Sequence, residues 1–311
     1  MNSASKYIRL STGFNMPLVG IGTYKTTGRE KIFNVLDEAL GVGYHSIDTA
    51  AVYRNEEDIG YALKTLLNKY ALERDDIFIT TKLAPSDNGN PQRIRKAVET
   101  SLKALGTSYI DLYLVHWPGT GGIPEDSIEN IKLRSITWQT LIDLKSQGFL
   151  RSIGVSNYTI KHLQLLLQDC HGESPAVNQV GFFLFLFKEM IYRVLLFKVE
   201  CHPHYRQGKL LEFCKKEGIH VQAYSSLGTS NETTLLKDPI VCRVAEELNV
   251  SPARVLLKWA LQQGIGIIPK ATSKEHIHDN FKLDFTINET QMKALCSLPQ
   301  RKYAWSPDNV V

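Results

Sequence analysis

Three residues whose side chains can hold charge or move a proton lie at the ends of apolar runs: Asp48, Lys82 and His116. These are residue types that enzymes use for acid and base chemistry. A lysine inside an apolar strand is costly unless a carboxylate pairs with it, and Asp48 lies one apolar run earlier. The set therefore predicts a charged site that is shared between neighbouring strands.

Each of the three residues also has an ordinary structural explanation. Asp48 could cap the helical turn that follows it, because aspartate is common at that position. Lys82 could extend its charge out of the fold, and His116 could be a hydrogen-bonded core residue. The functional interpretation thus depends on the three residues together and not on any one of them.

Eight short apolar runs alternate with amphipathic stretches and predict the elements that position these residues. The predicted strands are Val19–Tyr24, His45–Thr49, Ile77–Leu83, Ile110–Trp117, Ser152–Ser156, Ala176–Val180, His220–Tyr224 and Gly266–Pro269. The predicted helices include Glu30–Leu40, Asn55–Asn68, Pro91–Leu105, Ile136–Gln147, Ile160–Gln168 and Gly208–Lys216. Before them, Tyr7–Leu10 and Met16–Val19 flank a polar turn and predict an N-terminal β-hairpin.

Alternating strands and helices predict parallel pairing, in either a closed barrel or a doubly wound open sheet. A dinucleotide-binding open sheet would carry Gly-x-Gly-x-x-Gly after its first strand. Gly20-Ile-Gly22 begins that pattern, but Lys25 stands where the last glycine would be. We therefore predict an α/β fold with one (β/α)8 TIM barrel domain over residues 1–311. In such a barrel the chemistry lies at the carboxyl ends of the strands.

The composition excludes several other classes of protein. The chain has 311 residues, of which 43% are hydrophobic, and its net charge of +4 is not gathered in a basic run, so no nucleic-acid partner is expected. Five scattered cysteines predict neither a disulfide framework nor a metal site, because Cys201-His-Pro-His204 with Cys214 lacks recognised ligand spacing. The N-terminus shows no basic start followed by an apolar core, so we expect a cytoplasmic protein. We also expect a monomer.

Five motifs, in order along the chain, resemble those of the aldo-keto reductase family. They are Gly43-Tyr-His-Ser-Ile-Asp-Thr-Ala50 with Tyr53, Thr80-Thr-Lys-Leu83, Tyr113-Leu-Val-His-Trp-Pro118, Gly154-Val-Ser-Asn157 and Ile268-Pro-Lys270. The similarity extends from Arg9 to about Pro307. It implies NADP(H) bound in an extended form across the C-terminal face of the barrel, and NADPH-dependent reduction of aldehydes and ketones to alcohols.

The resemblance also assigns roles to four catalytic residues. Reduction by hydride transfer places negative charge on the carbonyl oxygen, so the site must also supply a proton. Tyr53 would donate it, and the ammonium of Lys82 would lower the pKa of the Tyr53 phenol. Asp48 would hold Lys82 charged and oriented. His116 would bind the substrate oxygen.

The remaining assignments concern the cofactor and the substrate pocket. Ser156, Asn157 and Gln179 match residues that bind the nicotinamide carboxamide, and Tyr224 matches the ring that stacks on the nicotinamide. The other cofactor positions are Thr23 and Asp48, then Ser225 and Leu227 along the pyrophosphate, and Lys270, Thr272, His276 and Asn280 around the 2′-phosphate. The family often has arginine where His276 stands, so weaker binding of the 2′-phosphate is expected. Tyr24, His116 and Trp117 are expected to line the substrate pocket.

One segment does not fit the family. Gly181–Lys198 is crowded with large apolar side chains and lacks the turn residues of a loop. Removing Val180–Lys198 joins Ala176-Val-Asn-Gln to Val199-Glu-Cys-His-Pro203 as one strand. Valine codons begin with GT and one lysine codon ends in AG, so the segment has the form of an in-frame retained intron. We predict a non-family insertion at 180–198.

The insertion leaves two alternatives open for function. A membrane span is disfavoured because Lys188, Glu189 and Arg193 interrupt an apolar stretch shorter than the roughly 20 residues that a span requires. Since the segment follows Gln179 so closely, it is expected to protrude near the nicotinamide site. The alternative to an active reductase is therefore a catalytically silent barrel that binds nucleotide or a protein partner.

Overall fold

The computed structural model describes residues 6–180, 201–224, 226–227, 235–300 and 307–311. Its strands are β1 (Tyr7–Arg9), β2 (Asn15–Pro17), β3 (Ile21–Gly22), β4 (Ser46–Asp48), β5 (Phe78–Leu83), β6 (Ile110–Val115), β7 (Leu150–Ser156), β8 (Val177–Val180), β9 (His220–Ala223) and β10 (Gly266–Ile267). Its α-helices are α1 (Arg29–Val42), α2 (Glu56–Lys69), α3 (Pro91–Leu105), α4 (Glu129–Ser146), α5 (Ile160–Gln168), α6 (Gly208–Lys216), α7 (Pro239–Leu248), α8 (Pro252–Leu261), α9 (Lys274–Phe281) and α10 (Glu289–Cys296). None of the helices in these ranges combines the length and the apolar character that a membrane span requires.

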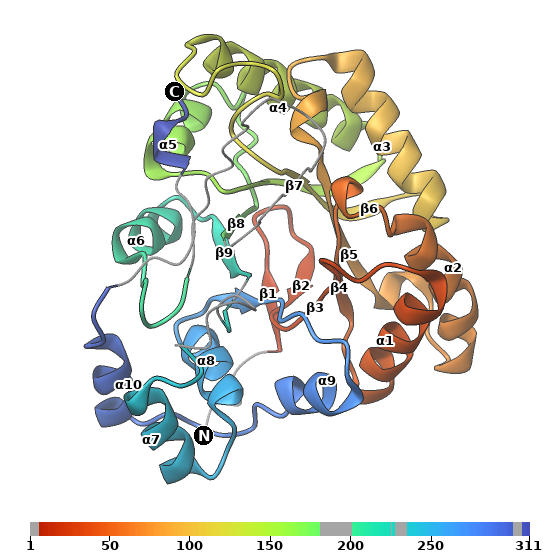
Figure 1. Ribbon diagram of the computed structural model, residues 1–311. Coiled ribbons are helices and arrows are strands. Elements are labelled where there is room, and N and C mark those ends of the chain that lie inside the picture. The colour runs from red at the N-terminus through yellow and green to blue at the C-terminus, as the bar shows by residue number, and fades with distance from the viewer. Residues whose placement is uncertain (1–5, 181–200, 225, 228–234, 301–306) are drawn as a thin grey trace.

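The eight strands from β3 to β10 form one sheet in chain order, and every neighbouring pair is parallel. The sheet closes on itself through parallel bridges from Val19 to Ile267 and from Gly22 to Lys270. The amide of Ile267 donates to the carbonyl of Leu18 at 2.7 Å across this seam. Helices surround the strands in Figure 1. The predicted TIM barrel is confirmed.

The N-terminal hairpin closes one end of the barrel. β1 and β2 pair antiparallel, with Ile8 opposite Met16, as the sequence predicts. Leu10 and Met16 pack in a separate apolar cluster with side chains from the barrel interior, among them Leu112 and Val177. Thr12 Oγ1 also lies 2.7 Å from Ser152 Oγ at the start of β7. The hairpin therefore fills the N-terminal end and leaves the chemistry to the opposite end.

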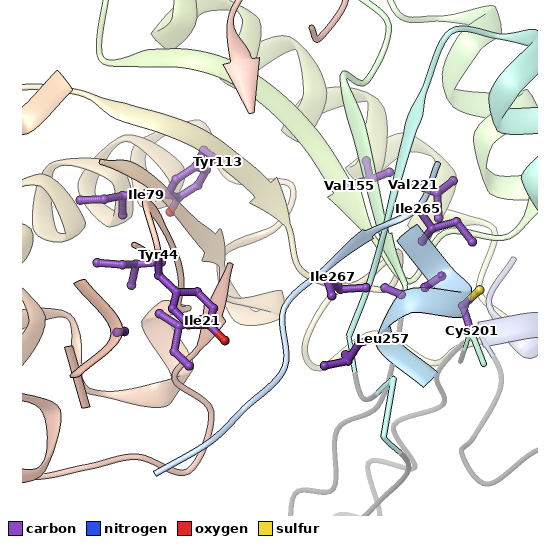
Figure 2. Packing of buried hydrophobic residues seen from close by; sticks show 14 of the residues in the cluster. Ile21, Tyr44, Ile79, Tyr113, Val155, Cys201, Val221, Leu257, Ile265 and Ile267 are labelled. Carbon is purple, nitrogen blue, oxygen red and sulfur yellow. The ribbon is translucent and has the colours of Figure 1, made fainter. Parts of the chain in front are cut away.

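The main core lies between the strands and the helices. Alternate strand residues such as Ile47, Ile79 and Val155 point outward and meet the apolar faces of the helices. Figure 2 shows such residues together with Leu257 from α8. Gly154 in β7 allows the close approach of its neighbours, since a Cβ there would lie 2.5 Å from the carbonyl oxygen of Val177. Strand alternation thus separates the outward core from the inward polar residues.

Element boundaries differ from the prediction in several places. α3, α5 and α6 have the predicted bounds, whereas α4 begins at Glu129 and not at Ile136. The buried residues in the first two turns of α4 include the polar Asn130 and Arg134, so apolar periodicity does not reveal that these turns are helical. Helices α7 to α10 lie outside the predicted set, although Asp238 and Ser251 cap α7 and α8 directly before a proline. The strands β3 and β10 are shorter than predicted, and the flanking residues Val19 and Lys270 form only isolated bridges across the seam.

Candidate active site

A buried ion pair occupies the carboxyl ends of β4 and β5. Asp48 is opposite Thr80 in the register, so Lys82 lies two residues further on the same face. Lys82 Nζ lies 2.8 and 2.9 Å from the two carboxylate oxygens of Asp48 and 2.7 Å from the carbonyl oxygen of Thr49. The side chains are 1% and 5% exposed. Three acceptors around one nitrogen match the three donors of an ammonium group.

Burial acts on both partners of this pair. It raises the pKa of Asp48 and lowers the pKa of Lys82, because each charged form loses water. The attraction between the two charges, together with their hydrogen bonds, opposes both shifts. Each of the two charges is therefore tolerated in the interior only because the other lies beside it. Removing one residue leaves a buried charge without compensation.

Tyr53 lies beside this pair. It belongs to the short 3₁₀ helix Ala51–Tyr53 that follows β4, and Lys82 Nζ is 5.2 Å from the centre of its ring. Burial, followed by the charge of Asp48, raises the pKa of the Tyr53 phenol well above its ordinary value. The net shift is therefore upward, against the predicted lowering. Burial disfavours the phenolate, and the carboxylate of Asp48 opposes the effect of the Lys82 ammonium.

Aromatic side chains gather around Tyr53. The ring centres of Tyr24 and Tyr53 are 5.2 Å apart, and those of Tyr53 and His116 are 6.0 Å apart with the ring planes at 72°. His116 follows β6 directly, so its ring comes from the same end of the barrel. Trp117 is buried, and the amide nitrogen of Asn88 donates to its carbonyl at 3.1 Å. The structure therefore brings Tyr24, Tyr53 and His116 together and fixes the backbone of Trp117.

The residues assigned to the carboxamide also meet. Ser156 Oγ donates to the carbonyl of Gln179 at 2.9 Å, and Asn157 Nδ2 donates to Ser156 Oγ at 3.0 Å and to the carbonyl of His116 at 2.9 Å. Tyr224 Oη donates to Asn157 Oδ1 at 3.0 Å. Asn157 has φ of 65°, in the left-handed region that asparagine tolerates. This network connects the ends of β6, β7, β8 and β9.

Gln179 joins this network to the ion pair. Its side-chain nitrogen donates to Asp48 Oδ2 at 2.6 Å and to Gln222 Oε1 at 2.8 Å. Thr23 is fully buried, and its hydroxyl donates to the backbone carbonyl of Asp48 at 2.9 Å. Sequence reasoning did not select Gln222. Its signal was a long polar side chain within the short, mostly buried strand His220–Ala223.

Asn55 is a second residue that sequence reasoning did not assign to the site. It is buried, accepts from Thr49 Oγ1 at 2.6 Å and donates to the carbonyls of Thr23 and Thr26. These bonds hold the loop after β3 against the loop after β4. The sequence placed Asn55 at the start of a helix, where asparagine is ordinary, so nothing distinguished it from a cap.

Three lysines lie near the seam of the barrel. Lys270 forms a backbone β-bridge with Gly22. Burial, followed by the charges of Lys31 and Lys25, lowers the pKa of Lys270. Among the described residues, none of these three lysines has an ion pair with a carboxylate. Like charges held together without a carboxylate fit an anionic group, and a phosphate is such a group. The chemistry of this cluster therefore suits the 2′-phosphate of NADP(H).

The other assigned cofactor residues have varied surroundings. Thr272 and His276 are exposed, Leu227 is half-buried and Asn280 is buried. The amide of His276 donates to Ser273 Oγ in the first turn of α9. Ser225 lies outside the described residues, as does the segment 181–200 that contains most of the predicted insertion.

A closed parallel barrel whose charged side chains meet at the carboxyl ends of its strands has the architecture of TIM-barrel enzymes. Comparison with known proteins specifies the class. The profile of the Aldo/keto reductase family matches residues 18–299. The chain is 33% identical over 318 residues to human aldo-keto reductase family 1 member C2, covering 96% of this chain and 93% of the relative. It is also 33% identical over 337 residues to glycerol 2-dehydrogenase (NADP(+)) of Saccharomyces cerevisiae, covering 100% and 98%.

Solved structures agree with these relatives. The aldose reductase of Schistosoma japonicum superposes with a TM-score of 0.80 at 32% identity, covering 96% of this chain and 94% of that one. An aldo-keto reductase from a deep-sea metagenome library superposes with a TM-score of 0.82 at 31% identity, covering 98% and 99%. The chain belongs to the aldo-keto reductase family. It is therefore an oxidoreductase that acts on carbonyl or alcohol groups.

Proposed function

We propose that this chain reduces aldehydes and ketones to alcohols with NADPH, and that Tyr53 donates the proton. The observation that carries the proposal is the buried Asp48–Lys82 pair, with Lys82 Nζ 5.2 Å from the ring centre of Tyr53. NADPH supplies the hydride when it is bound. The protein supplies the proton, the orientation and the charge that stabilises the developing oxyanion.

The raised pKa of the Tyr53 phenol means that its proton is firmly held, so proton transfer requires a neighbouring charge that stabilises the phenolate. Once the proton has left, the phenolate lies beside the ammonium of Lys82, which stabilises it. Asp48 keeps that ammonium charged and in place through two hydrogen bonds.

His116 and its neighbours would orient the substrate. The His116 ring stands edge-on to the Tyr53 ring, so a carbonyl oxygen between them would meet a nitrogen donor and the phenol together. Tyr24 would form another wall of the same pocket, and Trp117 a further one. These substrate roles are predictions, as are the cytoplasmic location and the monomeric state.

The cofactor preference is proposed from charge. Lys270, with Lys25 and Lys31 nearby, would bind the 2′-phosphate that distinguishes NADP(H) from NAD(H). Thr272, His276 and Asn280 would complete that end. Ser156, Asn157 and Gln179 would bind the carboxamide, Tyr224 would stack on the nicotinamide, and Thr23, Ser225 and Leu227 would line the path between. Because His276 lacks the fork of an arginine, the preference would be weaker than with arginine.

Replacing Tyr53 with phenylalanine tests the proposal. The ring is retained and only the proton donor is lost, so reduction of 4-nitrobenzaldehyde should fall by about 10²–10⁴-fold. NADPH binding, measured by quenching of protein fluorescence, should be nearly unchanged. Turnover of the variant at more than about one percent of the starting rate would remove Tyr53 from this role.

A second candidate function follows from the position of the predicted insertion. Gln179 lies in β8, and the segment 181–200 begins directly after that strand. If the insertion at 180–198 blocks the site, the chain is a barrel that binds nucleotide without turnover. Fluorescence quenching by NADPH with no aldehyde reduction would favour this candidate over the reductase.

Deleting residues 180–198 separates the two candidates. The shortened protein should be more soluble and more active, since large apolar side chains near the nicotinamide site would be removed. Full activity of the long protein would contradict the disruption. Sequencing transcripts across the Gln179 codon tests the origin of the segment: if only the long form is found, the retained-intron hypothesis is wrong.

A further inference from the structure

Gln222 is a buried polar residue that the proposed reaction does not use. It lies in β9 directly opposite Gln179 in β8, and both side chains are at most 1% exposed. Gln222 Oε1 accepts from Gln179 Nε2 at 2.8 Å. Burying an amide inside a barrel is costly unless all of its polar atoms are hydrogen-bonded. The choice of glutamine at this position therefore requires an explanation.

Asp48 and Gln222 together decide which way the amide of Gln179 faces. Asp48 accepts two bonds from Lys82, so its carboxylate acts as an acceptor and must face the nitrogen of Gln179. That nitrogen has two N–H groups. Asp48 Oδ2 accepts one at 2.6 Å, and Gln222 Oε1 accepts the other at 2.8 Å. Both donors of Gln179 are thereby used, and its oxygen is the atom left to meet a ligand.

We propose that Gln222 is a positioning residue that fixes the amide of Gln179 with its oxygen toward the carboxamide of the nicotinamide. The inference depends on the proposed function, because it assigns Gln179 to that carboxamide. The carboxamide nitrogen of the cofactor is a donor and needs an acceptor, which the oxygen of Gln179 provides. Without Gln222, one N–H of Gln179 loses its partner and only the bond to Asp48 still restrains the amide.

The other end of the Gln222 amide argues against a purely structural role. Its nitrogen is buried and has no hydrogen-bond partner among the described residues. An unsatisfied buried donor destabilises the fold, so an apolar residue would pack there at lower cost. The oxygen of Gln222 is the part of the side chain that makes a bond. Glutamine is explained at position 222 because its oxygen accepts a hydrogen bond from Gln179 Nε2 and so helps to hold that amide in one orientation.

The test compares two ligands that share the phosphate end. NADPH carries the nicotinamide, whereas adenosine 2′,5′-bisphosphate carries the 2′-phosphate without it. In Gln222→Leu, we expect the dissociation constant for NADPH to rise about fivefold to tenfold, the value of one hydrogen bond. The dissociation constant for adenosine 2′,5′-bisphosphate should not change. In Gln222→Glu, burial and the nearby Asp48 keep the new carboxyl protonated, so it still offers an acceptor oxygen at the same reach and should restore most of the NADPH affinity.

A double variant tests whether Gln222 acts through Gln179. Gln179→Leu should weaken NADPH selectively, and adding Gln222→Leu should cause no further loss, because the residue to be positioned is already gone. Gln222→Met is the substitute if the leucine variant does not fold. Equal weakening of both ligands, unchanged NADPH affinity, or full additivity with Gln179→Leu would overturn the inference. Binding of neither ligand to the starting protein would instead overturn the proposed function on which the inference depends.

Discussion

Two buried aspartates lie at opposite ends of the same barrel. Asp111 is the second residue of β6 and lies at the N-terminal end, whereas Asp48 is the last residue of β4 and lies at the C-terminal end. Their side chains are equally buried, at 5% exposure each. Asp111 accepts from Arg74 at 2.7 Å, from Arg151 at 3.2 Å and from the amide of Ile79 at 3.0 Å.

The two aspartates differ in the cations that accompany them. Arg74 and Arg151 reach the surface, at 21% and 27% exposure, and both stack on the ring of Tyr109. The charge of Asp111 is thus shared with two hydrated partners. Asp48 depends on the single cation Lys82, which is 1% exposed. The N-terminal cluster spreads its charge over two partly exposed arginines, and the C-terminal pair keeps a buried charge beside the phenol of Tyr53.

Lys82→Met should produce the largest effect. Reduction should fall at least 100-fold, because the phenolate of Tyr53 loses its stabilising charge. Stability should also fall by about 3–5 kcal/mol, since Asp48 is left as a lone buried charge. Urea unfolding and steady-state oxidation of NADPH measure the two effects.

A double variant separates these two effects of Lys82→Met. Adding Asp48→Asn to Lys82→Met removes the lone charge, so stability should recover while reduction stays lost. A normal rate in either variant would contradict the role of Lys82.

Acid should weaken both ends of the barrel through buried histidines. Burial lowers the pKa of His162, in the first turn of α5, and of His220, at the start of β9, to about 4. Since the ordinary value is about 6.5, the unfolded chain binds protons that the folded chain does not. Stability should therefore fall as the pH drops from about 6.5 to 4, by about 3 kcal/mol for each histidine.

Variants at His162 test this acid dependence. His162 Nε2 donates to the carbonyl of Val310 at 2.8 Å, so His162→Gln keeps a donor but does not titrate. The glutamine variant should lose less stability than the starting protein between pH 7 and pH 4 in urea unfolding. Parallel pH curves for the two proteins would exclude His162 as a source of the acid sensitivity.

The contrast between the two ends also shows what the sequence can predict. Asp48 and Lys82 were found because a charge in an apolar strand is costly, and the register then placed them on one face. The number of barrel strands followed from alternation, and the missing last glycine of Gly-x-Gly-x-x-Gly then favoured the closed barrel over an open sheet. The upward shift of the Tyr53 pKa did not follow from the sequence, because it depends first on how deeply the phenol is buried and then on the charge of Asp48. Gln222 was missed because nothing local shows that it faces Gln179 across the sheet.

Asp111→Asn should affect stability without affecting chemistry. The asparagine still accepts a hydrogen bond but loses two charge interactions, and both arginines are partly exposed and screened. We expect a loss of about 1–2 kcal/mol in the free energy of unfolding. The ratio kcat/KM should stay within about twofold of the starting value. Lost activity with unchanged stability would mean that the two ends do not differ in the way described.

The smallest effect concerns the cations near the seam of the barrel. At the N-terminal end Arg74 and Arg151 are paired, whereas Lys270 at the C-terminal end has like-charged neighbours and no carboxylate partner among the described residues. If this excess charge binds the 2′-phosphate, His276→Arg should add a charge-assisted bond and strengthen NADPH binding by about 1 kcal/mol, roughly fivefold. NADH, which lacks that phosphate, should bind as before. Lys270→Met is the matched opposite: it should weaken NADPH much more than NADH. Equal changes for the two cofactors in both variants would place the phosphate elsewhere, and the lysine cluster would then require a different anionic ligand.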